Sequence, residues 1–199
     1  MDLEKFLEES FYVDYENENI ISKAEELFSQ QMNAVQKAKA AYEFVRDEIP
    51  HSFDKQPAAV TARASDVLRY KTGICHAKSN LLAALLRSQG IPAGFCFEHI
   101  TLVNDDSMGY CLHCYNAVYL DSRWIRLDAR GNKEGINAQF SVDKPVLAYI
   151  PRPQYDEYFI KGIFSCPDTG TMKMLENAKT LEDIMENIPD CMSIEPDII

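Results

Sequence analysis

Cys75 is the residue in this sequence best placed to act as a nucleophile. It opens an apolar segment, residues 75–86, whose spacing of three to four predicts a helix that is apolar on most sides. Gly90 and Pro92 end this helix. A thiol in the first turn lies near unpaired N–H groups and the positive end of the helix dipole, which favours the thiolate. A buried cysteine that only caps a core helix is the alternative, and Cys75 alone does not decide between the two.

A hairpin downstream offers the partners that a catalytic thiol needs. Segments 111–120 and 123–128 have the composition of strands, and Asp121 and Ser122 between them predict a two-residue loop. A nucleophilic cysteine requires a histidine to accept its proton and an acid or amide to hold the imidazole. The hairpin carries both kinds of residue.

His113 and Asp128 are the candidate base and orienting acid. In the expected register Asp128 lies opposite Tyr115, which shares a face with His113 two positions away. The pair is then diagonal, about 7 to 8 Å apart between backbone positions, and the two side chains can meet. A surface cross-strand pair is the alternative, and a shift of one residue would put them on opposite faces. His76 is a poor base because it adjoins Cys75 and points about 100° away from it on the helix.

The cysteines Cys111 and Cys114 raise a second possibility, a zinc site. Residues three apart on a strand point to opposite faces and lie about 10 Å apart, so these two thiols cannot hold one ion unless the strand breaks. The sequence also has no second pair. We therefore expect neither a metal nor a cofactor in the site.

Three spaced motifs resemble the transglutaminase-like superfamily, in its small, bacterial-type, single-domain form. They are G-I-C at 73–75 with the run LLAALLRSQGIP after it, H-C-Y-N-A-V from His113, and R-W-I-R-L-D ending at Asp128. The resemblance covers roughly residues 41–128. It implies a papain-like core with a cysteine at a helix N-terminus and a histidine and an acid on adjacent antiparallel strands. It does not carry calcium dependence over to this chain, because the calcium-requiring animal enzymes have further domains.

Matched residue by residue, the resemblance implies a catalytic triad of Cys75 as nucleophile, His113 as general base and acid, and Asp128 as orienter. The reaction would then be hydrolysis or acyl transfer at a peptide or protein amide through a thioester. The Cys75 N–H would bind the oxyanion with a second donor, for which His51 and Tyr70 are candidates. His76 and Lys78 would line the entrance to the site, and Gly73 would leave room for the carbonyl. A catalytically inactive peptide-binding module of the same fold is the alternative function.

The elements that must position these residues come in two blocks, helices first and strands after them, which predicts an α+β fold with helices packed on an antiparallel sheet. We expect helices near residues 20–28, from an Asn33 cap to Pro50, and at 66–70 with a Ser65 cap. We also expect an irregular segment around Pro57 and a strand near 95–98 with one buried face. Residues 1–135 would form the catalytic core. Residues 136–199 would form an extension with two short helices, at 172–177 and at 181–186 behind a Thr180 cap, that packs on the core or covers the cleft.

Composition restricts the partners. The 20 Lys and Arg against 31 Asp and Glu give a net charge of −11, which disfavours nucleic acid and anionic membrane surfaces. The acidic N-terminus does not resemble a signal peptide, and no apolar run reaches the length of a membrane span. We therefore expect a cytoplasmic protein whose six cysteines are thiols. The substrate, the acyl acceptor and the oligomeric state stay open.

Overall fold

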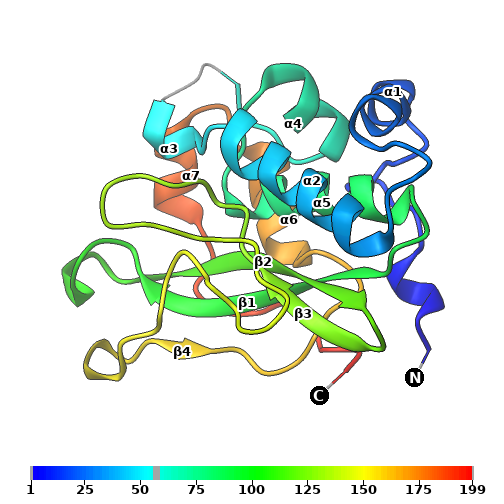
Figure 1. The fold of residues 1–199 in the computed structure, drawn as a ribbon. Helices are drawn as coiled ribbons and strands as arrows, with labels where there is room; N and C mark the ends of the chain where they lie inside the picture. Colours follow the sequence, from blue (N-terminus) through cyan, green and yellow to red (C-terminus); the bar gives the residue numbers. More distant parts are fainter. Residues whose placement is uncertain (1, 56–58, 199) are drawn as a thin grey trace.

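The centre of the molecule is a four-stranded antiparallel sheet. The computed structural model describes residues 2–55 and 59–198, so Pro57 lies outside the described residues. The strand order is β3-β2-β1-β4, and the strands are β1 (Ala93–Thr101), β2 (Tyr110–Leu120), β3 (Arg123–Leu127) and β4 (Tyr158–Phe159). Helices gather on one side of this sheet (Figure 1). The predicted α+β class is confirmed.

The described part of the chain contains seven α-helices and three short 3-10 turns. The α-helices are α1 (Glu18–Leu27), α2 (Ala34–Glu48), α3 (Ser52–Lys55), α4 (Ala64–Tyr70), α5 (Cys75–Arg87), α6 (Thr169–Asn177) and α7 (Leu181–Asn187). The 3-10 turns are η1 (Glu4–Phe6), η2 (Asp106–Met108) and η3 (Pro153–Tyr155). None of the described helices combines the length and the apolar character that crossing a membrane requires.

Helix α5 is the element around which the core is built. Every residue from Cys75 to Arg87 is buried, because α2 and α4 pack on it from one side and the sheet from the other. Leu81 and Leu85 contribute fully buried side chains to one cluster with Phe95 and Phe97 of β1. Each such side chain stabilises the fold by about 1.5–3 kcal/mol relative to an exposed one. The position of Cys75 is therefore fixed by the whole core.

The hairpin of β2 and β3 has the predicted register. Leu120 pairs with Arg123 and Asn116 with Leu127, so Asp128 directly follows the last pair. Asp121 and Ser122 both have positive φ, 48° and 64°. These are the backbone angles of a type I′ turn, which matches the twist of the flanking strands.

The prediction that β1 has one buried face is wrong, because both faces are covered. Cys96 and Glu98, expected on the open face, are fully buried. Phe6 from η1 and Ile163 from the C-terminal extension pack under the sheet against Cys96 and Tyr115. The alternating pattern of the strand did not indicate this second layer, since two segments far away in sequence supply it.

Side-chain caps fix several helix starts. Asn33 and Gln36 form a capping box at α2, and Thr180 and Asp183 form another at α7, as predicted for Asn33 and Thr180. The predicted Ser65 cap is wrong. Helix α4 begins at Ala64 without a side-chain cap, and the Ser65 N–H and hydroxyl donate instead to the buried carboxylate of Asp14.

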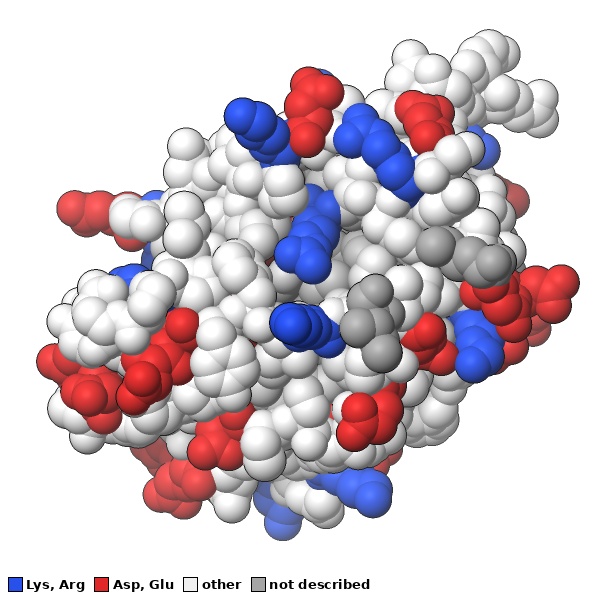
Figure 2. All heavy atoms as spheres, turned by 90° about the horizontal axis from the view of Figure 1, so that it is seen from below, with Lys and Arg blue, Asp and Glu red and all other residues white. Residues whose placement is uncertain are grey.

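The C-terminal extension wraps around the sheet and back to the helices. Its β4 pairs with the free edge of β1, and its Ile163 N–H donates to Ile198 O at 2.8 Å. Helices α6 and α7 pack through Met172 and Ile184 on Ile74, the residue before Cys75. On the face below the sheet, Lys and Arg side chains lie in the middle and acidic side chains toward the edges (Figure 2).

Candidate active site

His113 and Asp128 meet in the structure. Nε2 of His113 lies 2.8 Å from Oδ2 of Asp128. The two residues are only 2% and 1% exposed. Strand β2 carries the histidine, and the residue after β3 carries the acid, so the hairpin register alone brings them together. The predicted cross-strand contact is therefore present, and it is buried rather than at the surface.

Asp128 is held by more than His113. Its Oδ1 accepts the Arg130 N–H at 3.0 Å and its Oδ2 accepts the Ala148 N–H at 2.9 Å. Burial raises the pKa of this carboxyl, but His113 and the two backbone donors outweigh it, and the pKa ends below its usual value. The carboxylate is thus charged and fixed in orientation.

The other ring nitrogen of His113 is left for the thiol. Cys75 and His113 both line one cavity. Burial lowers the pKa of His113, yet Asp128 and Cys75 together raise it well above its usual value. An imidazolium beside the Asp128 carboxylate is the charge arrangement that follows.

Aromatic rings shield the histidine. The Tyr149 ring stands edge-on to the imidazole with centroids 4.8 Å apart and planes at 81°, and the Tyr115 ring lies on another side at 6.2 Å. Excluding water in this way strengthens the bond between His113 and Asp128. The sequence does not mark Tyr149 as part of the site, because no periodic pattern is present in segment 145–151.

The cavity has a volume of about 670 Å³. Its lining includes the apolar side chains of Ile74, Ile100, Leu112, Met185 and Ile188. Met185 and Ile188 belong to the C-terminal extension, which therefore forms one wall of the cleft besides packing on the core. A cavity of this volume is within the range of small-molecule and cofactor sites in proteins.

The expectation that His76 and Lys78 line the entrance is wrong. Both are buried, since α5 is enclosed on all sides, and the His76 ring bonds to Leu112 O at 2.9 Å. Lys78 donates through Nζ to the carbonyls of Ile49 and Arg130. Burial, followed by the charge of Arg130, lowers the pKa of Lys78 to about 7. Lys78 therefore ties α5 to the end of α2 and to the turn after Asp128.

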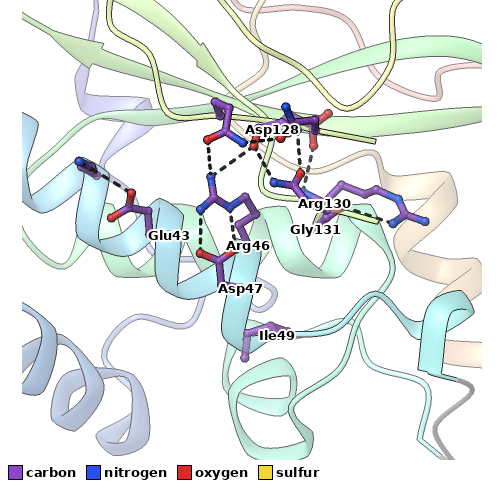
Figure 3. Close-up of polar contacts among 12 residues, drawn as sticks. Glu43, Arg46, Asp47, Ile49, Asp128, Arg130 and Gly131 are labelled. Atoms are coloured by element: carbon purple, nitrogen blue, oxygen red, sulfur yellow. Dashed lines mark hydrogen bonds and ion pairs between the residues drawn. The ribbon is translucent and has the colours of Figure 1, made fainter. Parts of the chain in front are cut away.

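That turn is tied to its surroundings by further polar contacts. Figure 3 shows Asp128, Arg130 and Gly131 beside the end of α2. Arg130 also forms two hydrogen bonds with Asp54 of α3, with Nη1 to Oδ2 at 2.6 Å and Nη2 to Oδ1 at 3.1 Å. The acid of the site is thus positioned by α2, α3 and α5 together.

Of the two candidates for a second oxyanion donor, only His51 lies at the site. Tyr70 is half exposed at the end of α4 and does not line the cavity. His51 lines the cavity, and its Nε2 accepts the Cys75 N–H at 3.1 Å. In this structure His51 is therefore an acceptor, the reverse of the expected role.

The structure requires glycine at position 73 for a different reason from the one expected. A Cβ there would lie 3.1 Å from Ala77 Cβ and 3.4 Å from Lys78 Cγ. The missing side chain thus lets the segment before α5 pack against the first turn of the helix, and it does not open space for a carbonyl. Cys111 lines the cavity while Cys114 packs in the core, as strand alternation predicts.

A cysteine that begins a helix and faces a buried histidine–aspartate pair on antiparallel strands is the arrangement of a thiol enzyme. Residues 21–129 match the family model of the transglutaminase-like superfamily. The match spans more than half of the chain, so the protein belongs to this superfamily. The resemblance seen in the three motifs is confirmed.

Solved structures give weaker likenesses. A proposed cysteine protease from Cytophaga hutchinsonii has 20% sequence identity and a TM-score of 0.49, over 65% of this chain and 43% of that one. A protein described as a TGase has 20% identity and a TM-score of 0.40, over 66% of this chain and 35% of that one. The chain thus matches less than half the length of either structure. A search of curated proteins finds no significant match.

Proposed function

We propose that the protein is a thiol-dependent amide hydrolase or acyl transferase that acts on peptide or glutamine-type amides. In this proposal Cys75 is the nucleophile, His113 the general base and acid, and Asp128 the residue that orients the imidazole. The buried 2.8 Å contact between His113 and Asp128, beside a thiol at a helix N-terminus, is the observation that supports it most.

The first half of the reaction forms a thioester. The Cys75 thiolate attacks the amide carbon, and a C–S bond forms while the carbonyl electrons move to oxygen. The tetrahedral intermediate collapses when the C–N bond breaks, and the His113 imidazolium gives its proton to the leaving nitrogen. Ammonia or an amine departs. Asp128 keeps the ring in position throughout, because two backbone N–H groups hold its carboxylate.

The second half releases the acyl group. His113, now neutral, takes a proton from water or from an acceptor amine as that nucleophile attacks the thioester carbon. The C–S bond then breaks and the Cys75 thiolate is restored beside the imidazolium. Hydrolysis and acyl transfer differ only in which nucleophile enters the cavity at this stage.

The experiment that tests the proposal follows three products from one panel of substrates. Peptides with an internal glutamine report ammonia, peptide p-nitroanilides report p-nitroaniline, and added methylamine reports transfer by its incorporation. We expect turnover of at least one class, lost in Cys75→Ser and retained in Cys166→Ser, whose thiol is exposed. Turnover that persists in Cys75→Ser would contradict the assignment of Cys75 as nucleophile. No turnover of any class would contradict the proposal and favour a binding module.

A further inference from the structure

The backbone N–H of Cys75 is already engaged in this structure. It donates to Nε2 of His51 at 3.1 Å, and α5 has no side-chain cap at Ile74. The proposed reaction needs this same N–H for the developing oxyanion, because it lies beside the attacking sulfur. The lone pair of His51 Nε2 would also repel an oxyanion placed there. His51 therefore has to change its role before an oxyanion can be bound.

The surroundings of His51 hold its ring beside Cys75. The residue forms a parallel bridge with Gly73, and the Ser52 N–H donates to Gly73 O at 3.1 Å. The Phe53 ring covers the imidazole with centroids 5.9 Å apart. The segment before α5 and the segment after α2 are thus joined at this point, and a large displacement of His51 would break both contacts.

The protonation of His51 follows from its partners. Because Nε2 accepts a hydrogen bond, the proton of the neutral ring is on Nδ1. Nδ1 is buried and has no hydrogen-bond partner among the described residues. Burial lowers the pKa of His51 well below its usual value, and the charges of Arg130 and Lys78 lower it further. The ring is therefore neutral, and moving its proton from Nδ1 breaks no hydrogen bond to a described residue.

We propose that His51 is a further catalytic residue, the second oxyanion donor, whose Nε2 accepts the Cys75 N–H at rest and donates to the oxyanion during reaction. This inference rests on the proposed function. The ring proton passes from Nδ1 to Nε2 by exchange with water when the ring turns toward the cavity that it lines, so the ring stays neutral and no proton is gained or lost. An oxygen about 3 Å from both the Cys75 backbone nitrogen and His51 Nε2 lies off the line that joins these two atoms. A small rotation of the ring therefore lets both N–H groups reach that oxygen.

The test compares two reactions of the same thiolate. Acylation of Cys75 by p-nitrophenyl acetate, followed as a burst of p-nitrophenolate, passes through a tetrahedral oxyanion. Alkylation by iodoacetamide is a displacement at a saturated carbon and needs no oxyanion donor. We expect His51→Leu to lower the burst rate by about 10²–10³-fold, with the alkylation rate within about threefold of wild type. His51→Gln keeps an acceptor and an N–H donor, so its burst rate should be at least tenfold higher than that of His51→Leu.

The outcomes separate this inference from the proposed function. If the two rates of His51→Leu fall together, or if neither falls, His51 is not an oxyanion donor, although the proposed function stands. If wild type gives no burst above Cys75→Ser, the proposed function fails and this inference with it. A ¹⁵N spectrum of the resting protein gives an independent check, since it should show His51 protonated at Nδ1. Protonation at Nε2 in the resting protein would contradict the proposed transfer of the proton from Nδ1 to Nε2.

Discussion

His113 on β2 and Asp128, the residue that follows β3, are fifteen positions apart in sequence, and their side chains meet with 2.8 Å between Nε2 and Oδ2. The Asp128 carboxylate accepts hydrogen bonds from His113 and from the backbone N–H groups of Arg130 and Ala148, and two aromatic rings cover the imidazole. The orientation of the ring is thus set by the hairpin and by the extension that supplies Ala148 and Tyr149. In the proposed function, loss of this contact should impair chemistry more than folding.

Replacement of Asp128 by asparagine tests that expectation. Without the negative charge the pKa of His113 falls, so the imidazolium is lost at a lower pH and the ring is less firmly oriented. We expect turnover of the best substrate to fall by about 10²–10⁴-fold. The pH at which the alkylation rate of Cys75 changes, as the His113 imidazolium loses its proton, should also be lower than in wild type. Asp143→Asn, at an exposed position, is the control and should leave both profiles unchanged.

Glu98 predicts a pH-dependent loss of stability. It pairs with His113 across β1 and β2, and neither carboxylate oxygen has a partner among the described residues. Burial raises its pKa from 4.5 to about 7. Between these values the unfolded chain has released the proton while the folded chain keeps it, so the free energy of unfolding falls as pH rises. The shift corresponds to about 3 kcal/mol.

The measurement is urea unfolding of wild type and Glu98→Gln at pH 4.5 and pH 8. The variant cannot ionise, so its stability relative to wild type should rise by about 3 kcal/mol between the two pH values. Glu134→Gln, at an exposed position, serves as the control. An unchanged difference between Glu98→Gln and wild type at the two pH values would mean that folding does not raise the pKa of Glu98.

The turn of the hairpin offers a stabilising substitution away from the site. Ser122 has a φ of 64°, which costs a residue with a side chain about 1–2 kcal/mol and glycine almost nothing. We expect Ser122→Gly to raise the free energy of unfolding by about 1 kcal/mol without changing turnover. Ser122→Ala, which keeps the strain, should give no gain. Equal effects of the two substitutions would show that backbone strain at Ser122 is not the cause.

The central part of the site could be predicted because it depends on local geometry. The two-residue turn of Asp121 and Ser122 determines the register, and the register places Asp128 beside His113. The helix that begins at Cys75 follows from its apolar spacing and its end signals. Each of these predictions needs only a segment of about 20 residues and one repeating geometry.

The remainder of the site could not be predicted because distant segments supply it. Tyr149 and Ala148 reach the triad from a segment without a periodic pattern, and Asp54 meets Arg130 from α3. Lys78 was expected at the entrance because it flanks Cys75 at a position that varies among the proteins that the motifs resemble. It is buried because two backbone carbonyls, of Ile49 and Arg130, lie within reach of its Nζ. Such pairings depend on the packing of the whole chain.

The measurement that tests the account most directly is the alkylation rate of each cysteine by iodoacetamide at pH 6.5, read by mass spectrometry. We expect Cys75 to react faster than the more exposed Cys166 in wild type, because the His113 imidazolium stabilises its thiolate. His113→Ala should remove this advantage, and the control His99→Ala, whose ring stacks outside the cavity, should keep it. If Cys75 is no more reactive than Cys166, or if its rate is unchanged in His113→Ala, the proposed triad is contradicted.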